Sequence, residues 1–116
     1  MEAYELSAHR FRELKHFCLQ YHDMVTELKS LEGKDGYLDK HYDPTSELAI
    51  RENELRTAIR LIEMTARDTE SFLADRILKV VTEDVNVKGF TMPCTRDCME
   101  ELRRRYYWLL DRRKGL

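Results

Sequence analysis

Apolar residues in the first part of the chain recur at the spacing of one helix face. The intervals are three and four residues, and the positions are Phe11, Leu14, Cys18, Tyr21, Val25 and Leu28. A stripe this narrow is typical of a helix that packs lengthwise against another helix. Ser7 has the side chain of an N-cap, and Gly33 can end a helix in the left-handed conformation. The pattern therefore predicts one long helix over 7–32.

A second helix of similar length is expected after the polar loop 33–43. Asp43 and Pro44 supply an N-cap followed by proline at the first helical position. The helix is predicted over about 44–67 from the 3.6-residue period of its apolar positions, which are Leu48, Leu55, Ile59, Ile62 and Ala66. Two helices with matching stripes and a short connection pack as an antiparallel hairpin, so we expect such a hairpin over 7–67.

A third helix is predicted over 69–82, with Asp68 as its cap. Its inward positions are Phe72, Leu73, Ile77, Val80 and Val81. Residues 83–93 fit either a short helix or an extended turn, and Pro93 ends this segment. The sequence does not decide between the two alternatives.

The last helix is predicted over 96–113, with Thr95 as its cap. Its inward positions are Met99, Leu102, Tyr106 and Leu109. The predicted fold is therefore all-α, a single helical domain over 1–116. The long antiparallel helical hairpin is followed by a C-terminal helix-turn-helix-like unit over 68–116.

The composition agrees with amphipathic helices. Charged residues make up 36% of the chain and hydrophobic residues 42%, yet the net charge is only −2. Four glycines and two prolines supply too few turns for an all-β domain of this length. No apolar run approaches the roughly 18 residues of a membrane span, and the amino terminus lacks the pattern of a secretory signal. With an odd count of three cysteines, these features predict a reduced, cytoplasmic protein with no membrane partner.

Charge is distributed unevenly along the chain. Residues 94–116 hold seven basic and four acidic side chains, a balance of +3, whereas residues 1–93 hold 13 basic and 18 acidic, a balance of −5. A basic terminal helix on an acidic body is a pattern that phosphate backbones can use. The alternative is a solvated helix end whose cations interact with the carboxyl end of the helix dipole. Charge alone does not separate the two.

The order of the last two helices adds a more specific indication. A helix, a short break and a basic helix match a helix-turn-helix, in which the amino-terminal part of the second helix enters the major groove. A helical wheel points five side chains outward, namely Arg96, Glu100, Arg103, Arg104 and Tyr107. Arg96 and Arg103 can then reach guanine edges or phosphates, and Thr95 can touch a phosphate. Tyr107 and Trp108 are alternatively expected to pack on the first hairpin.

The sequence shows no pattern of a metal site or a catalytic centre. Cys94 and Cys98 are one helical turn apart, which is not the pair spacing of a zinc finger, and the four histidines are scattered. Nucleophile elbows, phosphate loops and glycine fingerprints are also missing. We therefore expect no metal, no cofactor and no enzymatic activity.

The chain resembles the RinA/ArpU-type small transcriptional regulators encoded by phages and mobile elements of Gram-positive bacteria. The resemblance rests on three blocks, YELSAHRFRELKHFCLQYHDMVTEL, DPTSELAIRENELRTAIRLIEMTA and MPCTRDCMEELRRRYYWLLDRR. It implies a scaffold of amino-terminal helices and a C-terminal helix-turn-helix similar to the promoter-reading region of a sigma factor. It also implies a recognition helix that starts near Thr95, with Arg96, Asp97, Glu100 and Arg103 facing DNA.

The sequence therefore predicts a DNA-binding transcriptional regulator of phage or mobile-element type whose partner is double-stranded DNA. The candidate contact residues are Thr95, Arg96, Asp97, Glu100, Arg103, Arg104 and Arg112. A homodimer is expected at least on DNA, because one module buries little surface. The alternative is a helical interaction module that binds a host or phage protein through the first hairpin, and a third possibility is a particle assembly subunit. The acidic body favours the interaction module, and the basic terminal helix favours DNA.

Overall fold

The computed structural model describes residues 6–38, 46–83 and 96–114, and every regular element in these ranges is helical. The elements in chain order are α1 (Ala8–Leu19), α2 (Tyr21–Leu38), α3 (Glu47–Thr69), the 3₁₀ turn η3 (Ser71–Leu73), α4 (Ala74–Glu83) and α5 (Arg96–Lys114). The predicted all-α class is therefore confirmed. No helix among the described residues has the length and apolar character needed to cross a membrane.

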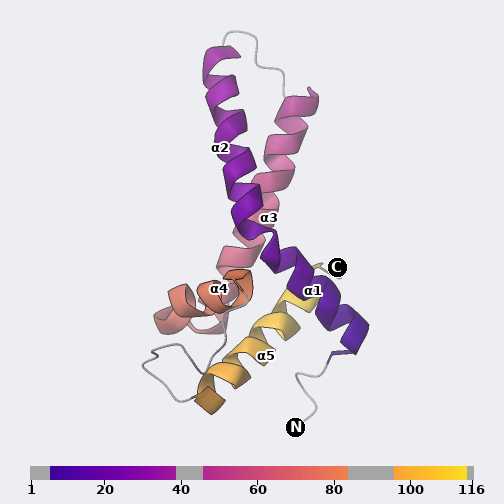
Figure 1. Ribbon diagram of the computed structural model, residues 1–116, viewed down its shortest axis with the longest axis vertical. Helices are drawn as coiled ribbons and strands as arrows, with labels where there is room; N and C mark the ends of the chain where they lie inside the picture. The colour runs from indigo at the N-terminus through magenta and orange to yellow at the C-terminus, as the bar shows by residue number, and fades with distance from the viewer. Residues whose placement is uncertain (1–5, 39–45, 84–95, 115–116) are drawn as a thin grey trace.

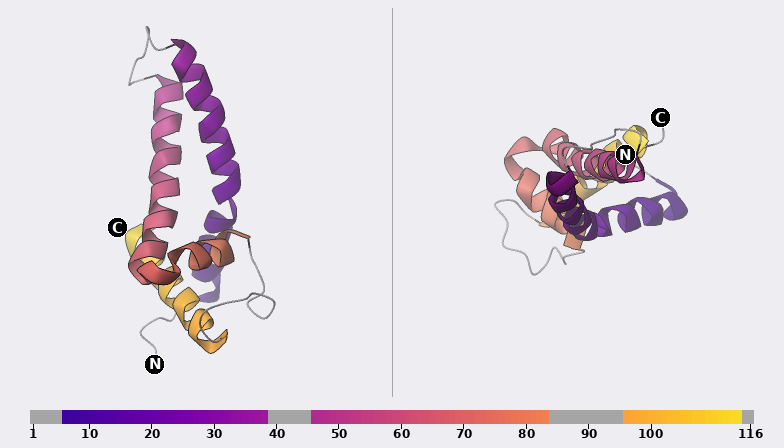
Figure 2. Two further views of the ribbon diagram at one scale, coloured as in Figure 1. Left: turned by 90° about the vertical axis from the view of Figure 1, so that its left-hand side faces the viewer. Right: turned by 90° about the horizontal axis from the view of Figure 1, so that it is seen from above.

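Helices α2 and α3 run antiparallel and form an arm that extends from the rest of the molecule (Figures 1 and 2). Two ion pairs join them along this arm. The guanidinium of Arg51 contacts Glu27 at 2.7 Å, and that of Arg56 contacts Glu32 at 3.1 Å. Near the base of the arm, the hydroxyl of Tyr21 donates to a carboxylate oxygen of α3. Helices α4 and α5 pack on the other half of α3, and α1 packs on α4 and α5.

The prediction of one helix over 7–32 is wrong, because the chain breaks between α1 and α2. Gln20 keeps helical backbone angles, but its N–H turns to the carbonyl oxygen of Phe17, as in a 3₁₀ turn. The break redirects the apolar stripe. Leu14 and Cys18 are fully buried among α4 and α5, whereas α2 packs along α3. A straight helix could not serve both surfaces, so the hairpin partner of α3 is α2 and not the whole of 7–32.

The helix ends also differ from the prediction at two places. Ser7 caps α1 as expected, since its hydroxyl accepts from the N–H of Arg10 at 3.1 Å. Gly33 does not end a helix, because α2 continues to Leu38. Helix α3 begins after Ser46, whose hydroxyl accepts from the N–H of Ala49 at 3.2 Å. The predicted start at 44 is therefore wrong, and the predicted cap Asp43 lies outside the described residues.

The junction between α3 and α4 is a corner and not the simple helix start that was predicted. Helix α3 includes Asp68, so this residue does not cap a helix over 69–82. Glu70 instead adopts an extended backbone, and its carboxylate accepts from the N–H of Phe72 at 3.2 Å. This cap starts η3, which turns the chain into α4. Phe72 was expected inward but is 84% exposed, and its neighbour Leu73 takes the buried position.

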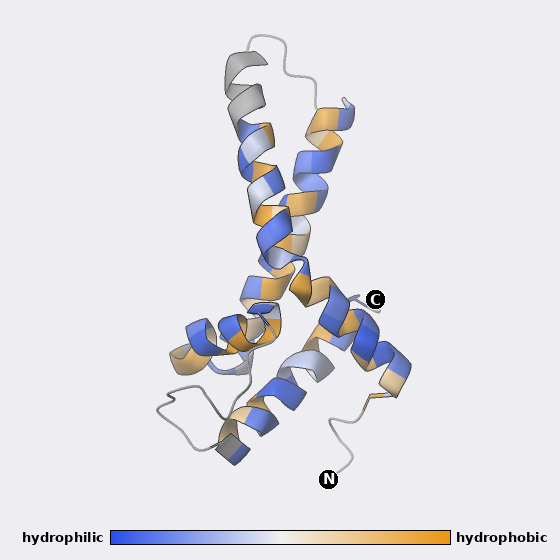
Figure 3. Cartoon of the chain, viewed as in Figure 1, coloured by the Kyte–Doolittle hydropathy of each residue, from blue (hydrophilic) through white to orange (hydrophobic). Residues whose placement is uncertain are grey.

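One core joins α1, α3, α4 and α5. Its most deeply buried large side chains, each less than 2% exposed, are Leu14, Ile62, Ile77, Met99, Tyr106 and Leu110. Figure 3 shows apolar and polar residues alternating along each of these helices, as expected for helices with one buried side. Three buried threonines are satisfied locally, because each hydroxyl donates to the carbonyl oxygen four residues earlier. The core therefore fixes how α5 is rotated, and with it which side of α5 meets solvent.

Candidate nucleic-acid interface

Helix α5 lies across α1, α3 and α4 and is anchored by four apolar side chains. The anchoring residues, none more than 6% exposed, are Met99, Leu102, Tyr106 and Leu110. Their intervals of three, four and four residues define a single face of the helix. Met99, Leu102 and Tyr106 were predicted from the sequence. The fourth buried residue is Leu110, whereas the predicted Leu109 is half-buried.

Tyr106 is the central contact of this face. Its hydroxyl donates to the carbonyl oxygen of Ile62 at 3.1 Å and lies 3.6 Å from Sγ of Cys18. Burial raises the pKa of Tyr106 above its ordinary value and raises the pKa of Cys18 to about 11. Both groups therefore stay neutral at physiological pH. Their role is to join α1, α3 and α5, and neither is a reactive group.

A second buried residue sets the rotation of α5. Tyr107 is 3% exposed, and its ring packs edge-to-face on Phe11 of α1, with ring centroids 5.0 Å apart. The prediction that Tyr107 points outward with the arginines is therefore wrong, and the expectation that it packs on the first helix is right. The face opposite these anchors consists of Asp97, Glu101, Arg104, Trp108 and Arg112, in which only Trp108 is half-buried.

The predicted contact residues divide between this outer face, its flank and the anchored side of the helix. Asp97, Arg104 and Arg112 are exposed on it, and Glu100 is half-buried on its flank. Arg103 is half-buried on the anchored side of the helix, between the positions of Tyr107 and Leu110. Arg96 is the first residue of α5, its side chain is not among those described, and Thr95 lies outside the described residues. The wheel drawn from Leu109 missed Glu101. Placing the two bulky residues Tyr107 and Leu110 inward would have rotated the helical wheel to the observed orientation.

Two basic residues in the carboxyl half of α5 bind α3. A guanidinium nitrogen of Arg105 donates to the carbonyl oxygen of Thr69 at 3.3 Å. Arg113 donates to the hydroxyl of Thr65 at 3.3 Å and forms an ion pair with Asp68. These two arginines therefore hold α5 in place.

The last two basic residues of the described helix lie on aromatic rings. The guanidinium of Arg112 is 4.2 Å from the centroid of the Trp108 ring, and the ammonium of Lys114 is 4.0 Å from that of Phe17. Such cation–π contacts contribute about 0.5–1 kcal/mol at exposed sites. Much of the positive balance of residues 94–116 is thus used within the molecule.

The amino half of α5 differs in charge from the carboxyl half. Residues 96–104 contain three basic and three acidic side chains, so their formal balance is zero. Within the described part of the chain, Arg103 and Arg104 form no hydrogen bond or ion pair with another residue. Two available guanidiniums interspersed with carboxylates suit contacts to individual hydrogen-bonding groups better than unspecific attraction to a phosphate backbone.

The described residues contain no group of three or more His, Cys, Asp or Glu side chains placed to hold a metal ion. Cys98 is half-buried at the start of α5 and has other contacts, and Cys94 lies outside the described ranges. The described residues in the amino half of α5 therefore offer hydrogen-bonding side chains but no cluster of metal ligands.

No protein-family model matches the chain. The comparison with curated proteins found no match. The comparison with solved structures found none either.

Proposed function

We propose that the protein binds double-stranded DNA through the amino half of α5 and acts as a transcriptional regulator. The observation that carries the proposal is the pair Arg103 and Arg104, which has no partner in the described part of the chain and lies on the projecting half of a firmly anchored helix. The amino end of α5 lies at the end of the molecule opposite the tip of the α2–α3 arm (Figures 1 and 2). The major groove, about 12 Å wide, admits a helix presented in this way.

Each exposed side chain has a contact that its chemistry favours. Arg104 can donate two hydrogen bonds to the O6 and N7 atoms of guanine, and the carboxylates of Asp97 and Glu101 can accept from the amino group of cytosine. Arg103, half-buried on the anchored side of the helix, is suited to a backbone phosphate at the edge of the contact. Because the formal charge of 96–104 is zero, specific base contacts must supply much of the affinity. The salt dependence is then expected to be shallow.

A single helix of this kind buries too little surface for tight binding. We therefore propose that two copies act on a two-fold symmetric site, with half-sites about one helical turn apart. In this arrangement the arm formed by α2 and α3 stays clear of the DNA, since it extends from the other end of the molecule.

The test is selection of binding sites from random duplexes, followed by affinity measurements on the enriched site. Arg104→Ala should weaken binding to that site by about 1–3 kcal/mol and relax the preference at one base pair. The matched control is Arg12→Ala on α1, since Arg12 is also an exposed arginine without a partner in the described residues. No enriched site, or equal losses for the two variants, would refute the proposal.

A further inference from the structure

The side of α3 that faces away from α2 carries exposed apolar residues at helix-packing intervals. Ile50 is 48% exposed, Met64 is 38% exposed and Leu61 is half-buried. With Thr57 they follow intervals of seven, four and three residues, which is the spacing of a seam between two helices. We call this side the α3 outer face. Leu61 packs against the core at one end of this seam, whereas Ile50 and Met64 are left exposed by the described residues.

A row of arginines runs beside the apolar seam. Arg56, Arg60 and Arg67 are exposed and recur at intervals of four and seven residues, so they share one side of the helix. Neither Arg60 nor Arg67 forms a hydrogen bond or ion pair with another residue in the described ranges. The face therefore combines an apolar seam with available positive charge.

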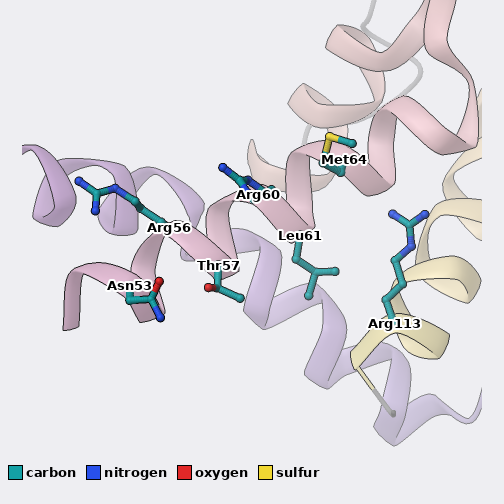
Figure 4. A pocket seen from close by; sticks show the side chains of 7 residues that line it. All are labelled: Asn53, Arg56, Thr57, Arg60, Leu61, Met64 and Arg113. Atoms are coloured by element: carbon teal, nitrogen blue, oxygen red, sulfur yellow. The ribbon is translucent and has the colours of Figure 1, made fainter. Parts of the chain in front are cut away.

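The two rows meet at an open hollow of about 450 Å³ between α3 and the end of α5 (Figure 4). Leu61 and Met64 line it from α3, together with the guanidinium-bearing side chain of Arg60. Arg113 of α5 lines its other side and rises beside Leu61 in the close view. Methionine adapts readily to different apolar partners, which suits Met64 to such a surface.

Acidic residues near this face are already paired. Glu54 lies 3.5 Å from a guanidinium nitrogen of Arg51, and Asp68 is held by Arg113. These two carboxylates therefore cancel little of the positive charge that Arg60 and Arg67 present. Glu63 lies one turn from both arginines and accepts from the neutral hydroxyl of Tyr21, so its charge offsets one of the two. A ligand that complements the face must offer apolar side chains in a line and carboxylates on one flank.

We propose that the α3 outer face binds an acidic amphipathic α-helix of another protein. Helix-in-groove recognition uses apolar anchors at the spacing found here, and glutamates or aspartates beside them can pair with Arg60 and Arg67. A second copy of this chain is disfavoured, because two such faces would bring like charges together. A phosphate backbone would meet the arginines but leave Ile50 and Met64 exposed to water.

This binding site is separate from the proposed DNA interface. The hollow is lined by Arg113 at the carboxyl end of α5, whereas the DNA-contacting residues lie in the amino half of that helix. One molecule could therefore hold DNA and a protein partner together. The inference stands independently of DNA binding, and its variants are chosen accordingly.

The probe is a fluorescent synthetic helical peptide with leucines at heptad a and d positions and glutamates at the flanking positions. The control peptide carries lysines in place of the glutamates. Binding is measured by fluorescence anisotropy with the whole chain. The protein variants are Arg60→Glu, Met64→Lys and, as a matched charge reversal elsewhere, Arg12→Glu. Circular dichroism checks that each variant folds, and Arg60→Gln replaces any Arg60→Glu protein that does not.

We expect the acidic peptide to bind at least tenfold more tightly than the lysine peptide. Arg60→Glu and Met64→Lys should each weaken it at least fivefold, Arg12→Glu should leave it unchanged, and Arg104→Ala should also leave it unchanged. Failure of the acidic peptide to bind would overturn the proposal, as would equal losses in Arg60→Glu and Arg12→Glu. Stronger peptide binding by Met64→Lys would point to charge alone. Loss of duplex DNA binding in Arg60→Glu, without loss of peptide binding, would assign the face to nucleic acid.

Discussion

Leu14→Ala should destabilise the protein more than most substitutions, because Leu14 joins α1 to the rest of the core. Its side chain is fully buried, and α1 packs on both α4 and α5. Transfer of a leucine side chain out of water contributes roughly 1.5–3 kcal/mol. Truncation also leaves a cavity in a closely packed core, so the measured loss for such a substitution is about 2–5 kcal/mol.

The assay is urea unfolding followed by circular dichroism, with Arg12→Ala as the control. Arg12 is two residues from Leu14 on the same helix, but it is exposed and has no partner in the described residues. The midpoint for Leu14→Ala should fall by the equivalent of at least 2 kcal/mol, with the slope unchanged. A loss no larger than that of the control would show that α1 does not pack on α4 and α5 as described.

Two further predictions test corrected or buried positions. Phe72→Ala should change the free energy of unfolding by no more than about 0.5 kcal/mol, whereas Leu73→Ala should lower it by about 2 kcal/mol or more. If urea unfolding ranked the two variants in the opposite order, the described junction between α3 and α4 would be contradicted. For the cysteines, mass spectrometry after iodoacetamide treatment at pH 8 should find Cys98 modified and Cys18 protected, because burial raises the pKa of Cys18 to about 11. Because the pKa of Cys18 in the folded state lies above its ordinary value of 9.0, the neutral thiol contributes stability below pH 9 that is lost as the pH rises toward 11. The free energy of unfolding should therefore fall less across this pH window in Cys18→Ala than in the unsubstituted protein.

The helical class and much of the core could be predicted from periodicity alone. Leu14, Ile62 and Ile77 were placed inward from their spacing and are buried, because a stripe of large aliphatic residues must be covered by something. The break at Gln20 could not be predicted in this way. The stripe continues through it without a glycine or proline, and only the need to pack on two differently oriented surfaces separates α1 from α2.

The rotation of α5 about its own axis also could not be predicted from the sequence alone. Tyr107 and Trp108 are adjacent aromatic residues, and the sequence does not say which of them the core accepts. Phe11 of α1 decides it, because its ring receives Tyr107 and leaves Trp108 half-buried. Likewise, the sequence counts Arg113 as an available cation, whereas the structure pairs it with Asp68, 45 residues earlier. Charge counts along a chain do not include such long-range pairing.

The central claim, that the amino half of α5 binds DNA, is tested most directly by titrating a duplex that carries the enriched site with the folded protein at several salt concentrations. Two or three phosphate contacts from residues such as Arg103 predict a slope of about −2 to −3 in a plot of log K against log salt. We expect binding at low salt with this shallow slope, and a slope reduced by about one in Arg103→Ala. Absence of binding at low salt by protein shown to be folded would contradict the account.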